Sequence, residues 1–280
     1  MKLKHYLTEF QEEFKGSRVQ NITSQEAVGM LKSKCKKAIQ QWEEGTYIRR
    51  WTSTASKIET GFLDASKMPP RLSRNTLNYY TNIINDDPMW KQYPRRQVIA
   101  SLRKTKNVTK NPTDFVVFPF DTTKVGICSH DDMWSSFSEL GKIGISANRY
   151  NDFIERLLND GKSYGETFDS SLSVFKKACK KFDKEVKADP NYIEDLKEHF
   201  KSIGLSSYEI DTLKSYKGDL YKSILYYYNP KGFKVAKPGS LKGRPNSEVW
   251  FEGPAVYINS PMIEMYFGVP EDSIFNAEQY

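Results

Sequence analysis

Two arginines stand inside an otherwise β-branched and aromatic run, Thr46–Trp51, which predicts a β-strand. Successive side chains of a strand point to opposite faces, so one of Arg49 and Arg50 is expected to point inward or into a cleft. An inward guanidinium needs an anionic partner, because an unpaired buried charge is very costly. A phosphate suits its bidentate geometry. The alternative is that both arginines lie on the surface of an edge strand.

A serine and a glutamate occupy comparable positions on two later strands. The run Val98–Leu102 predicts a strand in which Ser101 could position a ligand amide or a ribose. Glu248 begins another strand behind a loop rich in glycine and proline, so its carboxylate could act as an acid, a base or a stabiliser of a cation. Glu252 is expected on the same side of that strand. The alternatives are an ordinary strand serine and an exposed glutamate where a strand begins.

The order of these strands (arginine, serine, glutamate) resembles the mono-ADP-ribosyltransferase fold of the R-S-E type. In that family an early strand supplies an arginine, a middle strand a serine motif, and a late strand a glutamate that follows a turn-turn loop. Arg49, Ser101 and Glu248 match these three positions. Residues 237–246 stand where the family has its target-recognising loop, and Asn246 stands where most members carry glutamate or glutamine.

The resemblance implies that NAD is the substrate and that a protein or nucleic acid of a host cell accepts the ADP-ribose. Cleaving the glycosidic bond of NAD creates an oxocarbenium-like ribose, as in glycoside hydrolysis. Glu248 would stabilise that cation, and Ser101 would orient the nicotinamide side. Arg49 with Arg74 would hold the pyrophosphate, and Asn75 is a further candidate for binding NAD.

Residues 71–76 and 93–96 resemble segments of uncharacterised tailed-phage proteins, some of which are associated with the same fold. This resemblance implies a bacteriophage protein that acts in the cytoplasm of the host cell. A cytoplasmic location is also expected from the sequence itself. Its first residues turn polar at once, which predicts no signal peptide, and apolar runs such as Phe115–Phe120 are too short to cross a bilayer.

The charge balance suggests a second function. The chain has 42 lysines and arginines against 35 aspartates and glutamates, for a net charge of +7, which favours an anionic partner. Between residues 88 and 113 there are several basic residues and no acidic one. This stretch is either a solvated face or a contact surface formed by Arg95, Arg96, Arg103 and Lys104. In the latter case the chain is a basic nucleic-acid-binding or host-interaction protein without catalysis.

The sequence offers little for a metal site, and none is predicted. Its 3 cysteines have no CxxC spacing, which argues against zinc and disulfides and for a reducing compartment. His130, Asp131 and Asp132 could supply ligands, but adjacent acidic residues also suit a helix N-terminus. A nuclease or another phosphoryl-transfer enzyme that uses Asp131, Asp132 or Glu248 with Mg²⁺ is a third alternative.

The elements that must position these side chains predict an α+β fold with a mixed or antiparallel split sheet. A capping box, Thr23-x-x-Glu26, starts a helix that is expected to run to Glu44. Strands are expected at 46–51, 97–102, 115–120, 124–128, 248–252 and 255–258, and residues 52–73 are expected to form a loop. Helices are expected at 75–85, through most of 148–229, and after Ser260.

These elements predict four parts of the chain. They are N-terminal helices at 1–45, an ADP-ribosyltransferase-like core at 46–139 and 230–260, a helical lobe or insertion at 140–229, and a C-terminal tail at 261–280. The core strands on either side of the helical block must pair, because a lone strand cannot satisfy its backbone hydrogen bonds.

Overall fold

The computed structural model describes residues 19–51, 57–69, 78–105, 108, 110–139, 147–159, 170–189, 191–202 and 216–268. The chain divides into two compact units, each assembled from separate segments. Unit 1 consists of Met1–Pro69, Tyr93–Asp131 and Lys234–Tyr280, and unit 2 of Pro70–Gln92 and Asp132–Phe233. Unit 1 contains the strands and unit 2 is helical, so the prediction of an α+β fold is confirmed.

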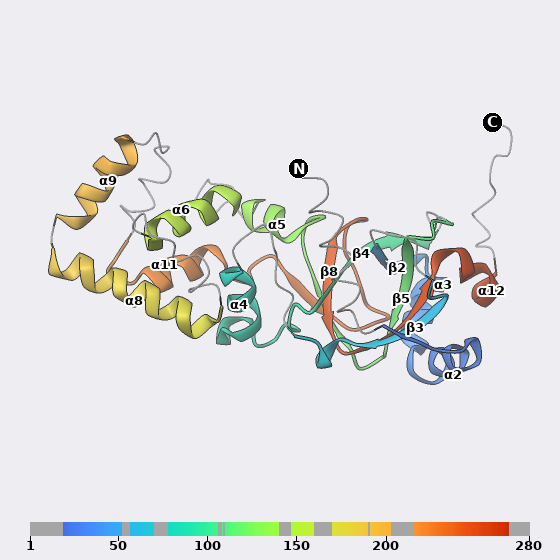
Figure 1. The fold of residues 1–280 in the computed structure, drawn as a ribbon. Helices are drawn as coiled ribbons and strands as arrows, with labels where there is room; N and C mark the ends of the chain where they lie inside the picture. Colours follow the sequence, from blue (N-terminus) through green and yellow to red (C-terminus); the bar gives the residue numbers. More distant parts are fainter. Residues whose placement is uncertain are drawn as a thin grey trace, which may run out of the picture. The chain divides into compact units, whose positions relative to one another are not determined.

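The described part of unit 1 is built on one sheet of nine antiparallel strands (Figure 1). Their order is β1-β3-β9-β5-β2-β4-β8-β6-β7. Their bounds are β1 (Gln20–Asn21), β2 (Thr46–Trp51), β3 (Thr60–Asp64), β4 (Val98–Lys104), β5 (Asp114–Pro119), β6 (Lys124–Ile127), β7 (Lys234–Ala236), β8 (Glu248–Glu252) and β9 (Pro254–Asn259). The last two strands in sequence, β8 and β9, therefore lie inside the sheet between earlier strands.

Each face of the sheet carries its own apolar cluster. One cluster contains Ile48, Leu102 and Val249. The other contains Tyr47 and Val116 and is covered by helices α2 (Ser24–Lys34), α3 (Lys36–Glu43) and α12 (Ile263–Phe267). Figure 1 shows α2 and α3 beside the strands of unit 1. Because side chains alternate along a strand, the two faces can be told apart from neighbours such as Tyr47 and Ile48. We call the face with α2 and α3 the helical face.

The N-terminal helix of the described chain begins as predicted but is interrupted. The capping box is confirmed: Glu26 N donates to Thr23 Oγ1 at 3.2 Å, and Thr23 N donates to Glu26 Oε2 at 2.8 Å. The helix expected to run to Glu44 is instead two helices, α2 and α3, divided at Cys35. The Cys35 thiol donates to Phe118 O of β5 at 3.3 Å, and burial raises its pKa to about 12. The break thus places a buried thiol directly against the sheet.

Two short strands differ from the predicted loops. The prediction of a loop at 52–73 is wrong at β3, which is a strand that pairs with β9. After residue 230 no strand was expected before 248, but β7 forms there and pairs with β6. β3 is packed closely, since a Cβ at Gly61 would lie 2.4 Å from Val19 Cγ1. Such strands are fixed by their partners rather than by local pattern. β2 and β8, by contrast, have the predicted bounds.

Unit 2 packs its helices around aromatic side chains. The helices are α4 (Tyr79–Asp86), α5 (Met133–Glu139), α6 (Ala147–Asn159), α8 (Leu172–Ala188), α9 (Tyr192–Ser202) and α11 (Leu220–Tyr227), with a 3₁₀ turn η2 (Pro88–Trp90). Tyr79 stacks on Phe175 with ring centroids 4.6 Å apart, and its hydroxyl lies 3.0 Å from that of Tyr228. Burial raises the pKa of Tyr79 well above its usual value. Within the described residues no helix is both long enough and apolar enough to span a membrane.

Candidate functional site

Three neighbouring strands bring Arg49, Ser101 and Glu248 into one row across the sheet. Arg49 of β2 faces Ser101 of β4, and Ser101 faces Glu248 of β8. Directly opposed residues of antiparallel strands project to the same face, and neighbouring strands are about 4.8 Å apart. The backbones of Arg49 and Glu248 are therefore about 10 Å apart. We call these three residues the polar row; it lies on the helical face, because Arg49 follows Tyr47 by two residues.

Arg49 is held by an aspartate that the sequence did not single out. Its Nη2 lies 2.8 Å from Asp114 Oδ1, and the side chains are 24% and 2% exposed, respectively. The Nε of Arg49 is buried and has no hydrogen-bond partner among the described residues. β2 lies between β4 and β5, so the alternative of surface arginines on an edge strand is wrong. The guanidinium is oriented by Asp114 while part of its donor capacity is unused.

An exposed aromatic ring lies on the same face as Arg49. Trp51 follows Arg49 by two residues, faces Asp114 across the sheet, and is 51% exposed. Arg50 projects to the other face, where its guanidinium carbon lies 6.0 Å from the centre of the Tyr257 ring. The two consecutive arginines therefore have different surroundings, and only Arg49 belongs to the polar row.

Ser101 connects the middle of the row to a second arginine. Its Oγ donates to Arg49 O at 3.4 Å, and Arg103 Nε donates to Ser101 Oγ at 3.4 Å. Both distances are at the long end for hydrogen bonds, so the hydroxyl is weakly held. Ser101 is half-buried, which leaves it accessible to a ligand on the helical face.

Glu248 is buried and ion-paired. Its Oε1 lies 2.9 Å from Arg96 Nη2, and the side chains are 9% and 7% exposed, respectively. The interpretation of Glu248 as an exposed residue at the beginning of a strand is therefore wrong. Its backbone N donates to His130 O at 2.8 Å, and its O accepts from Cys128 N at 2.9 Å. The preceding turn includes Asn246 at φ 72°. The turn at Asn246, the backbone hydrogen bonds of Glu248 and its ion pair with Arg96 together fix the position of the Glu248 carboxylate.

Arg96 is delivered to Glu248 by a segment anchored against β8. Tyr93 stacks on Trp250, with ring centroids 6.1 Å apart, and Trp250 Nε1 donates to Pro94 O at 2.9 Å. The Trp250 ring lies so close to β6 that a Cβ at Gly126 would be 2.2 Å from it. Glycine is therefore required at position 126 by close approach rather than by backbone angle.

The two glutamates of β8, Glu248 and Glu252, have different contacts. Arg95 N donates to Glu252 Oε2 at 3.0 Å, so Glu252 anchors the backbone before β4. Glu248, not Glu252, faces Ser101. The hypothesis that Arg96 is an exposed anion contact is wrong, since this residue is buried beside Glu248, and Arg95 is half-buried. The basic composition of residues 88–113 therefore did not predict that Arg96 is buried.

The remaining basic candidates differ in their exposure. Arg103 is half-buried and Lys104 is exposed at the end of β4, where Lys104 Nζ donates to Thr46 Oγ1 at 3.2 Å. Tyr47 faces Arg103 in the sheet; burial raises the pKa of Tyr47 to about 12, against the opposing effect of Arg49 and Arg103. Two further NAD-binding candidates, Arg74 and Asn75, lie outside the described residues.

Of the two aspartates that follow His130, Asp132 binds residues at the N-terminus of helix α5. Asp132 Oδ1 accepts from Ser135 N at 2.6 Å, and Asp132 Oδ2 accepts from Ser135 Oγ at 2.9 Å, immediately before and within the first turn of α5. This is the helix N-terminus that the sequence offered as the alternative to metal ligation. Among the described residues, no group of three or more His, Cys, Asp or Glu side chains could hold a metal ion.

Comparison of the chain with protein-family models, with curated proteins and with solved structures finds no match.

Proposed function

We propose that this protein is an NAD-dependent mono-ADP-ribosyltransferase, a glycosyltransferase that uses NAD as a substrate. One observation carries the proposal: Arg49, Ser101 and Glu248, which are far apart in sequence, stand side by side on one face of three adjacent strands. Their backbones lie within about 10 Å of one another, and they supply a guanidinium, a hydroxyl and a carboxylate to the same face of the sheet.

In the proposed reaction, the bond between C1′ of the ribose and N1 of nicotinamide breaks. The bonding electron pair leaves with N1, which converts the cationic pyridinium to neutral nicotinamide and leaves positive charge on C1′ and the ring oxygen. The Glu248 carboxylate stabilises this oxocarbenium-like charge. A nucleophile of the acceptor then bonds to C1′ and loses its proton to solvent or a base; water in its place gives hydrolysis.

Arg49 and Ser101 position the substrate in this scheme. The partly exposed Arg49 side chain binds pyrophosphate oxygens through its terminal amino groups, while Asp114 keeps the guanidinium oriented. The weakly held Ser101 hydroxyl bonds the nicotinamide amide or its ribose. The half-exposed Trp51 ring, on the same face, offers a surface on which a ring of the substrate can stack.

Arg96 acts on the reaction through Glu248 and is therefore a positioning residue. Its ion pair at 2.9 Å fixes where one carboxylate oxygen lies. A preorganised charge is worth far more to a developing cation than a mobile one, because the site does not have to reorganise during the reaction.

The test is NAD turnover by Glu248→Gln. The full-length protein is incubated with NAD labelled in its adenylate part and with a cell extract, and free nicotinamide and labelled macromolecules are measured. Loss of one electrostatic stabiliser lowers the rate by roughly 10²–10³-fold. Glu252→Gln, four residues away on the same strand, is the matched control and keeps its activity. Unchanged turnover in Glu248→Gln, with circular dichroism like that of the parent, contradicts the assignment.

We further propose that the acceptor is a macromolecule of a host cell and that the reaction takes place in its cytoplasm, as the phage resemblance implies. Label appearing on protein or nucleic acid of the extract supports transfer. Nicotinamide release with no labelled macromolecule supports hydrolysis of NAD instead.

A second candidate, binding of nucleic acid without catalysis, is favoured by the accessible Arg103 and Lys104 at the end of β4. Steep weakening of binding with salt and the absence of NAD consumption would distinguish it from the first.

A further inference from the structure

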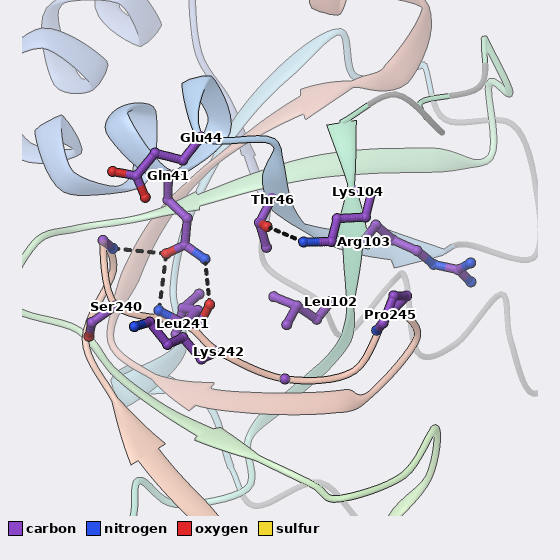
Figure 2. Close-up of a pocket in the computed structure, with 12 residues that line it drawn as sticks. Gln41, Glu44, Thr46, Leu102, Arg103, Lys104, Ser240, Leu241, Lys242 and Pro245 are labelled. Atoms are coloured by element: carbon purple, nitrogen blue, oxygen red, sulfur yellow. Dashed lines mark hydrogen bonds between the residues drawn. The ribbon is translucent and has the colours of Figure 1, made fainter. Parts of the chain in front are cut away.

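A cavity of about 260 Å³ opens in unit 1 where β2 begins and β4 ends, beneath the loop that leads to β8 (Figure 2). Its lining comes from three places: the end of α3 with the residues after it, the end of β4, and the loop. The residues are Gln41, Glu44, Thr46, Leu102, Arg103, Lys104, Gly239, Ser240, Leu241, Lys242, Gly243 and Pro245.

A buried glutamine holds the loop over this cavity. Gln41 of α3 is 4% exposed. Its Oε1 accepts from Gly239 N at 2.9 Å and from Leu241 N at 3.4 Å, and its Nε2 donates to Leu241 O at 3.2 Å, as the dashed lines of Figure 2 show. Gly239 has a φ of 85° and lies close to Lys37: a Cβ added to Gly239 would be 3.1 Å from the Cβ of Lys37. The amide thus fixes the shape of the loop, so the cavity is preformed.

The lining combines three kinds of chemistry. Leu102, Leu241 and Pro245 provide an apolar surface. Lys104 and Lys242 provide positive charge, with Arg103 at the rim. The hydroxyls of Thr46 and Ser240 and the carboxylate of Glu44, which also accepts from Gln40 Nε2 at 2.8 Å, provide acceptors for a ligand's hydroxyl or amino groups.

The floor of the cavity lies on the face opposite the polar row, although Arg103, which lines the cavity, also donates to Ser101 Oγ. Leu102 and Leu241 belong to the apolar cluster of the face opposite Tyr47, whereas Ser101 projects to the helical face. Figure 2 shows the Leu102 side chain directed toward the loop and that of Arg103 directed away from it. One NAD molecule held on the polar row would therefore not use the floor of this cavity.

We propose that this cavity binds a nucleoside phosphate at a site distinct from the one for NAD. The base packs on the leucines, the phosphate pairs with Lys104 and Lys242, and ribose or base donors bond Glu44. A bare phosphate would make no use of the apolar surface or of the Glu44 carboxylate. Small-molecule pockets usually have about 300–1,000 Å³, so a cavity of about 260 Å³ suits a single nucleotide better than a dinucleotide.

The nucleotide can be free or part of a nucleic acid strand. Three probes are titrated against the full-length protein: inorganic phosphate, 5′-AMP and a single-stranded 12-mer of DNA. We expect 5′-AMP to bind about tenfold or more tightly than phosphate, because the base and ribose add contacts. Tighter binding of the 12-mer than of 5′-AMP, with a steep salt dependence, identifies a strand as the source; equal affinities identify the free nucleotide.

The double variant Lys104→Gln/Lys242→Gln removes two exposed charges from the cavity, and we expect it to weaken 5′-AMP binding by about tenfold or more. The control Lys32→Gln/Lys57→Gln removes two exposed charges outside it and changes affinity by less than about twofold. Glu44→Gln weakens 5′-AMP binding but not phosphate binding.

Three results would overturn the proposal. They are 5′-AMP binding no more tightly than phosphate, equal weakening in the two double variants, and loss of 5′-AMP binding in Glu248→Gln. The last result would assign the nucleotide to the polar row. Because binding is measured without NAD turnover, an inactive protein that still binds 5′-AMP in this cavity contradicts only the proposed transferase activity.

Discussion

Replacing Arg96 by glutamine tests whether the buried ion pair with Glu248 organises the site. The two side chains are 7% and 9% exposed and their charged atoms are 2.9 Å apart. Glutamine keeps much of the volume and some hydrogen-bonding capacity but removes the charge. Glu248 is then left as a buried carboxylate without this charged partner.

The expected loss of stability follows from that geometry. At an effective dielectric constant of about 20, the attraction across 2.9 Å is roughly 6 kcal/mol before desolvation is subtracted. Breaking one side of a buried pair typically costs about 3–5 kcal/mol, because the remaining charge stays uncompensated. We expect the free energy of unfolding of Arg96→Gln to fall by an amount in that range, and NAD turnover to fall with it if Arg96 positions Glu248.

Urea unfolding followed by tryptophan fluorescence measures this change, since Trp250 lies beside the pair on the buried strand. Lys110→Gln is the matched control: it breaks an ion pair with Glu264 at 3.1 Å whose side chains are 68% and 36% exposed. That surface pair is worth about 1 kcal/mol or less. In Arg96→Gln/Glu248→Gln no uncompensated charge remains at this pair, so part of the loss is recovered. If Arg96→Gln is no more destabilising than Lys110→Gln, the reasoning is wrong.

Two further perturbations test the packing of unit 1. Gly126→Ala places a methyl group against the Trp250 ring and should lower the free energy of unfolding by about 1–3 kcal/mol, whereas Gly29→Ala in α2 meets no atom within 4 Å and should raise it by up to about 1 kcal/mol; urea unfolding compares the two. Because burial raises the folded-state pKa of Cys35 from 9.0 and of Tyr47 from 10.0, each to about 12, the stability they contribute is complete below pH 9 and is lost as pH rises from 9 toward 12. Urea midpoints measured from pH 8 to pH 11 should therefore fall, and fall less steeply in Tyr47→Phe; midpoints that rise with pH would contradict this.

The strands of the site were predictable, but their partners were not. The alternation and composition of 46–51 and 248–252 give the bounds of β2 and β8, because β-branched and aromatic residues fit a pleated surface. The common face of Arg49, Ser101 and Glu248 depends on pairing register, which is set by contacts across the sheet rather than within any one strand.

The ion pairs of the site show the same limit. Arg96 belongs to a basic stretch whose pattern favours a solvated edge, yet the stacking of Tyr93 on Trp250 turns it inward. Asp114 looks like an ordinary polar residue where a strand begins, and its pairing with Arg49 is visible only once β2 and β5 are adjacent. The ion-pair partners of Arg49 and Glu248 are far from them in sequence, so they could not be predicted from the sequence alone.

The position of β8 and β9 has a consequence for biosynthesis. Without these two strands, the described sheet consists of three separate pieces: β1 with β3, β5 with β2 and β4, and β6 with β7. A ribosome must therefore synthesise the chain as far as β9, which ends at Asn259, before all three pieces can be joined. The Glu248 carboxylate arrives with the strand that joins two of them. A nascent chain that ends before residue 248 thus has the arginine and the serine but not the acidic group, so the polar row is complete only once β8 has been made.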